Sequence, residues 1–231
     1  MDAIILAGGL GTRLRDTIGD LPKPMALVDG TPFLEFLLVE LSRQGVTRAV
    51  LSVGYRHDLI QRHFGSAFAS MTIDYAVETE PLGTGGAILR SLALTKDGPC
   101  FVLNGDTFAE VDLAAMWALH LSRNARITMA AMEVEDVGRF GALAVDGDIV
   151  RAFVEKGATG PGLINAGVYL IERDVFDAGP LPERFSFETD FMRPHLEVLS
   201  PIAFRAAGPF IDIGVPDDYQ AASSFFQRLA R

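Results

Sequence analysis

Short apolar runs alternate with longer segments of helical periodicity through the first half of the chain. The strand-like runs are AIILA (3–7), RAVLSVG (48–54), MTIDYAVE (71–78) and CFVLNGD (100–106). Helical spacing is found in the segments 32–45, 56–64, 85–94 and 112–121. Strands that alternate with crossover helices form a largely parallel sheet with helices on both faces. The sequence therefore predicts the α/β class.

The rhythm changes after about residue 126. ITMAAMEV (127–134), GALAVDGDIVRAFVEK (141–156) and INAGVYLIER (164–173) all resemble strands, and Asp146-Gly147 is a hairpin signal. FIDIG (210–214) predicts a last strand, and Pro216 opens a helix over 215–230. We expect one domain over 1–231, with a first half at 1–125 and a more antiparallel second half at 126–231.

Charge and composition exclude several classes of partner. The net charge is -10 and no cluster of Lys and Arg is visible, which argues against nucleic-acid binding. No apolar run reaches the roughly 18 residues of a membrane span, and the N-terminus has no basic region or cleavage site, so we expect no signal peptide. The one cysteine, Cys100, lies in an apolar strand and is expected to be a buried thiol. We expect a cytoplasmic protein without a membrane partner, and the sixteen Phe leave a homo-oligomer open.

The segment LAGGLGTRL (6–14) places three glycines directly after the first strand. Such a turn lets backbone N–H groups close on a phosphate, because no Cβ holds the ligand away. A dinucleotide-binding fingerprint lacks its third glycine here, and a P-loop lacks its Gly-Lys-Ser/Thr. Arg13 follows the glycines, and the prolines of LPKPM restrict the backbone around Lys23. Two cations beside bare amides indicate a polyphosphate site in an acidic protein.

LAGGLGTRLRDTIGDLPKPM resembles the signature of the sugar-1-phosphate nucleotidyltransferases, without gaps in either block. The resemblance covers essentially the whole chain and implies a single-domain Rossmann-like α/β/α sandwich with a mixed, mainly parallel central sheet. It also implies that Arg13 meets the β- and γ-phosphates and that Lys23 stabilises charge during transfer. The implied nucleotide contacts are Leu6, Ala7, Gly8, Gly9, Gly11, Thr12, Arg13, Lys23, Gly83 and Thr84. The last two lie in EPLGTGGA, where Gly85 stands in place of the alanine common in the family.

Two aspartates are the implied metal ligands. Asp106 ends the fourth strand in LNGDTF, and Asp212 lies in FIDIGVPDDY. Mg²⁺ prefers one or two carboxylates plus phosphate oxygens, so the pair suits that ion. The resemblance names Asp106, with Arg13 and Lys23, as catalytic. Asp217 and Asp218 follow Pro216 in the first turn of a helix, where acidic side chains offset the macrodipole, so we expect caps there.

The second half carries the implied sugar-phosphate contacts. Glu155 and Lys156 form the Glu-Lys pair that holds the sugar and its phosphate in the family. Asn165 lies in an otherwise apolar strand, where a buried amide needs partners that sugar hydroxyls can supply. We therefore expect residues 1–125 to bind nucleotide and residues 126–231 to bind sugar phosphate.

The implied reaction moves a nucleoside monophosphate from a nucleoside triphosphate to a sugar 1-phosphate and releases pyrophosphate. Among the short family members, the chain most resembles those that use GTP and a heptose 1-phosphate, so the resemblance alone implies these substrates. The blocks that together carry it are AIILAGGLGTRL, PFLEFLLVEL, EPLGTGGAI, VLNGDTF, GLINAGVYLI, RFSFETDF and FIDIGVPDDY. Mannose 1-phosphate with GTP and N-acetylmuramate 1-phosphate with UTP stay open, as does a regulatory homologue that senses a sugar nucleotide. We expect no C-terminal β-helix, and a nicotinamide-dependent oxidoreductase is disfavoured by the glycine pattern.

Overall fold

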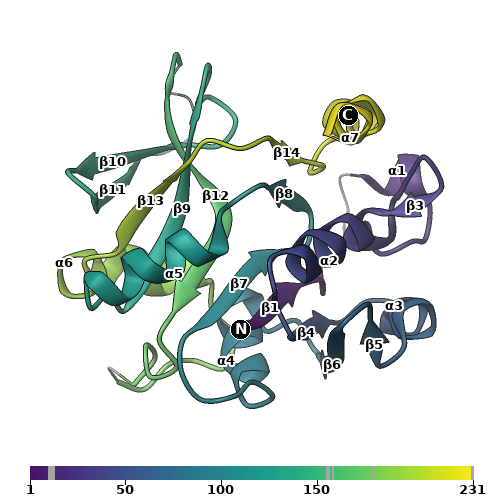
Figure 1. Cartoon of the computed structure of the whole chain (residues 1–231), viewed down its shortest axis with the longest axis horizontal. Helices are drawn as coiled ribbons and strands as arrows, with labels where there is room; N and C mark the ends of the chain where they lie inside the picture. Colours follow the sequence, from purple (N-terminus) through teal and green to yellow (C-terminus); the bar gives the residue numbers. More distant parts are fainter. Residues whose placement is uncertain (10–13, 155–156, 158, 178, 230–231) are drawn as a thin grey trace.

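The computed structural model describes residues 1–9, 14–154, 157, 159–177 and 179–229. Within these residues ten strands form one mixed sheet in the order β10–β11–β13–β9–β12–β7–β1–β4–β6–β5. Figure 1 shows the strands of the second half on the left and those of the first half on the right. The strands of this sheet are β1 (Asp2–Leu6), β4 (Arg48–Val53), β5 (Ala67–Phe68), β6 (Met71–Val77), β7 (Cys100–Asn104), β9 (Ile127–Val134), β10 (Ala142–Asp146), β11 (Ile149–Val154), β12 (Gly162–Ile171) and β13 (Ile202–Ala206).

The first half of the sheet is parallel at its centre, as the alternating pattern predicts. β1 pairs in parallel with both β4 and β7, and β4 pairs in parallel with β6. The carboxyl ends of these four strands therefore meet at one edge of the sheet, where open α/β sheets bind their ligands. The glycine-rich segment after β1 and the LNGDTF segment after β7 both begin at this edge.

The second half is mostly antiparallel. β12 runs antiparallel to both β7 and β9, and the predicted hairpin forms between β10 and β11 with Gly147 at φ +61°. The sequence analysis missed β13, which pairs in parallel with β9 and places Ile202 opposite Thr128. Its partner is distant in sequence, so no local turn signal announces it. The expected α/β class with a mixed central sheet and helices is confirmed.

Helices cover both faces of the sheet. Successive side chains of β1 point to opposite faces, and each face packs against a different helix. Ile5 packs in one hydrophobic cluster with Leu34 and Leu38, and Ile4 packs in another with Ile88 and Leu92. Thus α2 (Phe33–Arg43) and α4 (Gly83–Leu92) lie on opposite faces. The helices α3 (His57–Phe64) and α5 (Leu113–Ser122) complete the four helices predicted for the first half.

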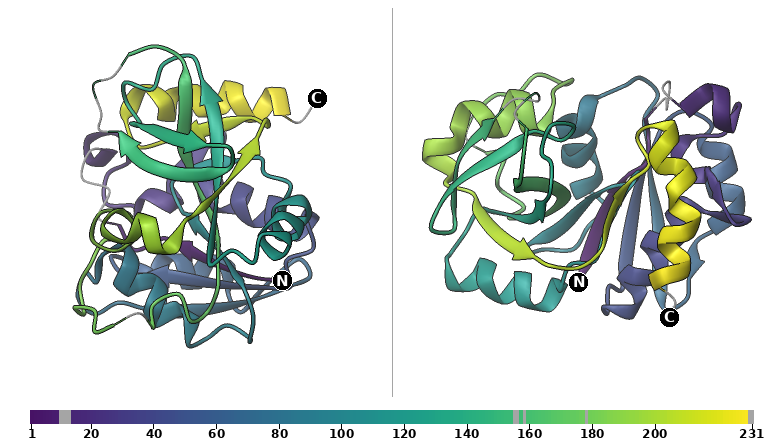
Figure 2. Two further views of the ribbon diagram at one scale, coloured as in Figure 1. Left: turned by 90° about the vertical axis from the view of Figure 1, so that its left-hand side faces the viewer. Right: turned by 90° about the horizontal axis from the view of Figure 1, so that it is seen from above.

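The last helix, α7 (Pro216–Leu229), returns to the N-terminal half of the molecule (Figures 1 and 2). The Phe226 ring stacks on Phe36 of α2 with centroids 3.9 Å apart, and the hydroxyl of Tyr219 donates to the carbonyl of Leu27 at 2.6 Å. The segment that precedes α7 therefore crosses the sheet at the carboxyl ends of the parallel strands.

The remaining described elements are short. They are α1 (Arg15–Ile18), η2 (Lys23–Met25), β2 (Leu27–Val28), β3 (Thr31–Pro32), β8 (Thr107–Ala109), the π-helix η3 (Phe187–Met192), η4 (Arg193–His195), α6 (Leu196–Leu199) and β14 (Phe210–Asp212). In the described part of the chain, no helix has the length and apolarity needed to cross a membrane. A single domain over 1–231 and self-association stay predictions.

Candidate active site

A two-stranded ribbon outside the main sheet brings the two predicted metal ligands together. β8 and β14 pair antiparallel with Asp212 opposite Thr107. The N–H of Ile213 donates to the carbonyl of Asp106 at 3.0 Å. Backbone hydrogen bonds therefore hold the two aspartates side by side, although their positions are 106 residues apart in sequence.

Lys23 lies against the same pair. Its Nζ is 2.5 Å from Oδ2 of Asp106, and the residue is only 8% exposed. A Cβ built on Gly214 would lie 2.8 Å from Oδ1 of Asp212 and 3.4 Å from Nζ of Lys23, so the ammonium group is also near Asp212. The extended Pro22 and the 3-10 turn Lys23–Met25 fix the backbone here, as the two prolines predict.

The electrostatics of Asp212 suit a cation. Burial, and next the negative charge of Asp106, raise the pKa of Asp212, while Lys23 and the N–H of Gly214 oppose that shift. A divalent ion between the two carboxylates would remove the repulsion that raises this pKa. The described residues hold no group of three or more His, Cys, Asp and Glu side chains that could bind a metal ion. Two carboxylates fit Mg²⁺, which takes its other ligands from water and substrate phosphate.

The described part of the glycine-rich loop lies beside this cluster. Leu6 ends β1, and the N–H of Ala7 donates to the carbonyl of Ser52 at 2.8 Å. A Cβ on Gly8 would lie 2.9 Å from Oε1 of Glu78, whereas a Cβ on Gly9 would meet no protein atom within 4 Å. A side chain at position 8 would therefore require the Glu78 carboxylate to shift, whereas position 9 has room for one.

The loop is joined to the aspartate ribbon through Gly105. Its N–H donates to the carbonyl of Leu6 at 3.0 Å, and a Cβ there would lie 2.6 Å from the same oxygen. The predicted contacts Gly11, Thr12 and Arg13 lie outside the described residues. Their roles stay predictions.

The second glycine-rich segment has a packing role that the sequence analysis did not foresee. Gly83 has φ +70°, and a Cβ on it would lie 2.5 Å from the carbonyl oxygen of Phe185. A Cβ on Gly85 would lie 2.1 Å from the ring of Phe185. Thr84 Oγ1 accepts the N–H of Phe187 at 2.9 Å. These contacts account for the small residues without a ligand, and nucleotide binding by Gly83 and Thr84 stays a prediction.

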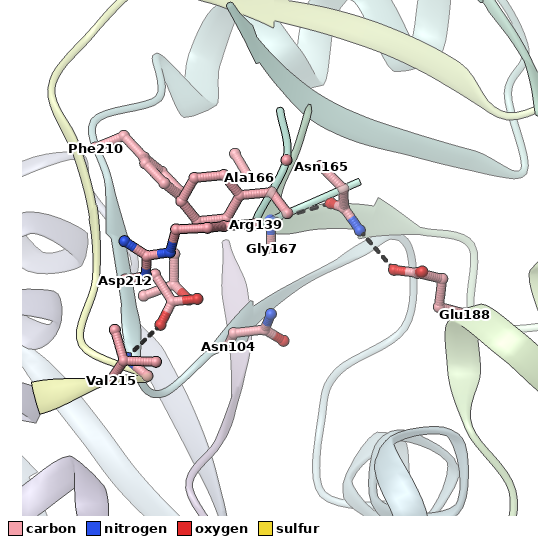
Figure 3. Close-up of a pocket in the computed structure, with 13 residues that line it drawn as sticks. Asn104, Arg139, Asn165, Ala166, Gly167, Glu188, Phe210, Asp212 and Val215 are labelled. Atoms are coloured by element: carbon pink, nitrogen blue, oxygen red, sulfur yellow. Dashed lines mark hydrogen bonds between the residues drawn. The ribbon is translucent and has the colours of Figure 1, made fainter. Parts of the chain in front are cut away.

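A cavity of about 370 Å³ opens beside Asp212. Figure 3 shows Asp212 and Arg139 at one side of this pocket, Glu188 at the other, and Asn104 and Gly167 between them. The predicted sugar contact Asn165 lines the cavity, but Glu155 and Lys156 lie outside the described residues. The cavity volume is in the range of small-molecule sites.

Sequence reasoning missed four polar residues of this pocket: Asn104, Thr107, Arg139 and Glu188. Asn104 directly precedes Gly105-Asp106 at the end of β7, so its position at a strand end was a usable signal. Arg139 lies in the connection between β9 and β10, where no pattern marks it. Its guanidinium Nη1 donates to Oδ1 of Asp218 at 2.9 Å, so Asp218 holds a pocket cation as well as lying in the first turn of α7.

Comparison with known proteins identifies the family. Residues 2–228 match the Nucleotidyl transferase family. The chain is 41% identical to D-glycero-alpha-D-manno-heptose 1-phosphate guanylyltransferase of Aneurinibacillus thermoaerophilus, over 98% of this chain and 99% of the relative. It is 44% identical to the protein of that name from Campylobacter jejuni, over 95% and 97%. The crystal structure of HddC from Yersinia pseudotuberculosis complexed with GMP-PN superposes with a TM-score of 0.86 at 39% identity, over 97% of this chain and 99% of that one. The chain therefore belongs to the nucleotidyl transferase family.

Proposed function

We propose that this enzyme is a D-glycero-α-D-manno-heptose 1-phosphate guanylyltransferase. It transfers GMP from GTP to the sugar 1-phosphate, forming GDP-heptose and pyrophosphate. The identities of 41% and 44% to two full-length relatives with that name support this choice of substrates. The expectation of GTP and a heptose 1-phosphate from the sequence blocks agrees with it.

The observation that carries the proposal is the convergence of Lys23, Asp106 and Asp212 between the glycine-rich loop and the pocket. A triphosphate cradled by residues 6–9 and 11–13 would lie close to this cluster, because Gly105, which directly precedes Asp106, is hydrogen-bonded to Leu6. A sugar phosphate in the pocket would then lie beside the same carboxylates. One site can thus hold both substrates of a transfer reaction.

The chemical obstacle is the approach of two polyanions. Two unit charges 4 Å apart repel by ~1 kcal/mol in water and by ~4 kcal/mol at an effective dielectric of 20. Lys23 and Arg139 place positive charge at this point, and we propose that Arg13 and Lys156 add to it. Asp106 and Asp212 would hold Mg²⁺, which when bound supplies further neutralisation of phosphate oxygens.

The nucleophile needs no activating base. An anionic oxygen of the sugar 1-phosphate attacks the α-phosphorus of GTP, a new P–O bond forms, and the bond to the pyrophosphate oxygen breaks with its electron pair. The residues of the site align the two substrates and stabilise charge, which is how phosphoryl transfer is catalysed generally. Because GTP is an intracellular substrate, we place the activity in the cytoplasm.

The test measures pyrophosphate release from each of the four common nucleoside triphosphates, with Mg²⁺ and one sugar 1-phosphate at a time. The panel contains the heptose, mannose and N-acetylmuramate 1-phosphates. We expect release with GTP and the heptose 1-phosphate, and loss of most turnover in Asp106→Asn and Lys23→Ala. If the enzyme preferred UTP with N-acetylmuramate 1-phosphate, or GTP with mannose 1-phosphate, the result would contradict the heptose assignment and support that alternative activity. Sugar-nucleotide binding without turnover would indicate a regulatory homologue.

A further inference from the structure

The far end of the pocket from Asp212 is built around the carboxylate of Glu188. We propose that Glu188 determines sugar specificity by accepting hydrogen bonds from the hydroxyls most remote from the sugar's phosphate, and that Asn165 is a positioning residue that orients it. This inference rests on the proposed function, since it assumes a sugar 1-phosphate in the pocket. It changes the role expected for Asn165, which the resemblance assigned to direct sugar contact.

The hydrogen bonds of Asn165 leave it no free donor. Its Nδ2 donates to the hydroxyl oxygen of Tyr169 at 2.6 Å and to Oε2 of Glu188 at 3.0 Å. Its Oδ1 accepts the N–H of Gly167 at 3.0 Å. An amide has two N–H donors, and both are engaged within the protein. Asn165 therefore holds Glu188 in place (Figure 3).

Glu188 has acceptor capacity left over. An ionised carboxylate offers about four lone-pair sites, and the contacts here are Asn165 on Oε2 and Nη2 of Arg193 on Oε1 at 3.4 Å. Its side chain is 36% exposed and lines the cavity. A carboxylate only accepts hydrogen bonds, so the ligand it suits at this end of the pocket is one that presents hydroxyl donors.

Asn165 and Glu188 both lie on irregular backbone, which places their side chains in the pocket. The pairing of β12 with β9 shifts register between Asn165 and Tyr169, and Gly167 inside the shift has φ +71°. Glu188 lies on a π-helix, η3. Bulges and π-helical turns are frequent at functional sites because they redirect side chains.

The orientation of the sugar in the pocket follows from the charged groups at the Asp212 end. The anomeric phosphate belongs near Asp212, Lys23 and the nucleotide, because the transfer takes place there. The carbons farthest from it then extend along Asn104 and Gly167 toward Glu188 (Figure 3). In a heptose these carbons carry the C6 and C7 hydroxyls. Mannose lacks C7, and 6-deoxymannose lacks both hydroxyls.

The discriminating experiment compares these three sugar 1-phosphates in the wild type and in Glu188→Gln. A site built to pair with a hydroxyl rejects an analogue without it, because its own polar group is left unpaired. We expect the wild type to prefer heptose over 6-deoxymannose 1-phosphate in kcat/KM by about a hundredfold or more, and Glu188→Gln to reduce this ratio at least tenfold. The change is expected in KM for the sugar, with KM for GTP unchanged.

Asn165→Ala should reduce the same ratio, because Glu188 loses its orienting donor. The matched control is Glu197→Gln, an exposed carboxylate on α6 just beyond the same segment, which should leave the ratio unchanged.

The outcomes separate this inference from the proposed function. A wild type that turns over none of these sugars contradicts the proposed function and removes the basis of this one. An active wild type whose ratio is the same in Glu188→Gln overturns the role of Glu188 alone. A rise in KM for GTP together with a lower melting temperature in Glu188→Gln overturns it too, because the residue would then be structural.

Discussion

Replacing Asp212 by asparagine is expected to stabilise the fold at neutral pH while removing most of the turnover. Asp212 is ionised at a cost, because burial and the charge of Asp106 raise its pKa above the ordinary 3.8. Asparagine removes that charge and keeps the Oδ1 that accepts the N–H of Gly214 at 2.6 Å. Turnover is expected to fall because the amide is a weak ligand for Mg²⁺.

The expected gain in stability of Asp212→Asn follows from the repulsion between the two carboxylates and its partial cancellation by Lys23. Two like charges at about 4 Å repel by ~4 kcal/mol at an effective dielectric of 20, and Lys23 cancels much of this. We expect a net gain of about 1 kcal/mol in the free energy of unfolding, or roughly 2–4 °C in melting temperature for a chain of this length.

Asp106→Asn should change stability in the opposite direction, because loss of the close pair with Lys23 outweighs the relief of repulsion with Asp212. It removes the partner of the buried Lys23, although solvent screens the pair because the Asp106 side chain is 39% exposed. We expect a loss of about 1 kcal/mol. Both variants should lose turnover, so the pair separates the proposed metal-binding role of the carboxylates from their effects on folding.

The raised pKa of Asp212 also determines how the stability advantage of Asp212→Asn changes with pH. A carboxyl whose pKa is raised in the folded state contributes stability that is present below pH 3.8 and is lost as pH rises through the raised value. The advantage of Asp212→Asn should therefore vanish near pH 3.8 and be complete at neutral pH. Thermal unfolding followed by circular dichroism, without metal or nucleotide, measures it. A melting temperature at pH 7 below that of the wild type would refute the reasoning.

Three further predictions concern glycines and the thiol. Gly85→Ala should destabilise the protein by about 1–3 kcal/mol, because its Cβ would lie 2.1 Å from the Phe185 ring, and an unchanged urea midpoint would contradict this. Gly9→Ala should keep the wild-type urea midpoint but raise KM for GTP, because its Cβ meets no protein atom within 4 Å and would occupy the space proposed for phosphate. Cys100 should resist alkylation at pH 8 in the folded protein, since burial raises the pKa of its thiol to about 12, and rapid labelling without denaturant would count against that assignment.

The sequence predicted the strands that have a clear apolar pattern and are bounded by a helix or a turn signal nearby in the chain. β1, β4, β6 and β7 are short apolar runs separated by amphipathic helices, and the hairpin β10–β11 carries its own turn residues. β13 was not predictable in this way, because its partners β9 and β11 precede it by a long stretch of chain and IAFRA has no turn signal of its own.

The site was predictable to the extent that resemblance supplied it. Lys23, Asp106 and Asp212 are brought together as expected, and Asn165 lines the pocket. Glu188 and Arg139 were missed, because a charged residue on a connecting segment looks the same in sequence whether it faces solvent or a cavity. The hydrogen bonds that commit Asn165 to Glu188 arise only after β12 and η3 have packed.

The ribbon of β8 and β14 lines one end of the pocket but is a separate sheet from the one that carries Asn165, and this division has a consequence for how the protein can diversify. The spacing of the two carboxylates is set by backbone pairing within the ribbon, whereas the residues proposed to face the sugar, Asn165 and Glu188, come from β12 and η3. Exchange of the latter segments can alter which substrate is accepted while the transfer machinery stays in place. We therefore expect sugar preference and transfer chemistry to respond to substitutions in different elements.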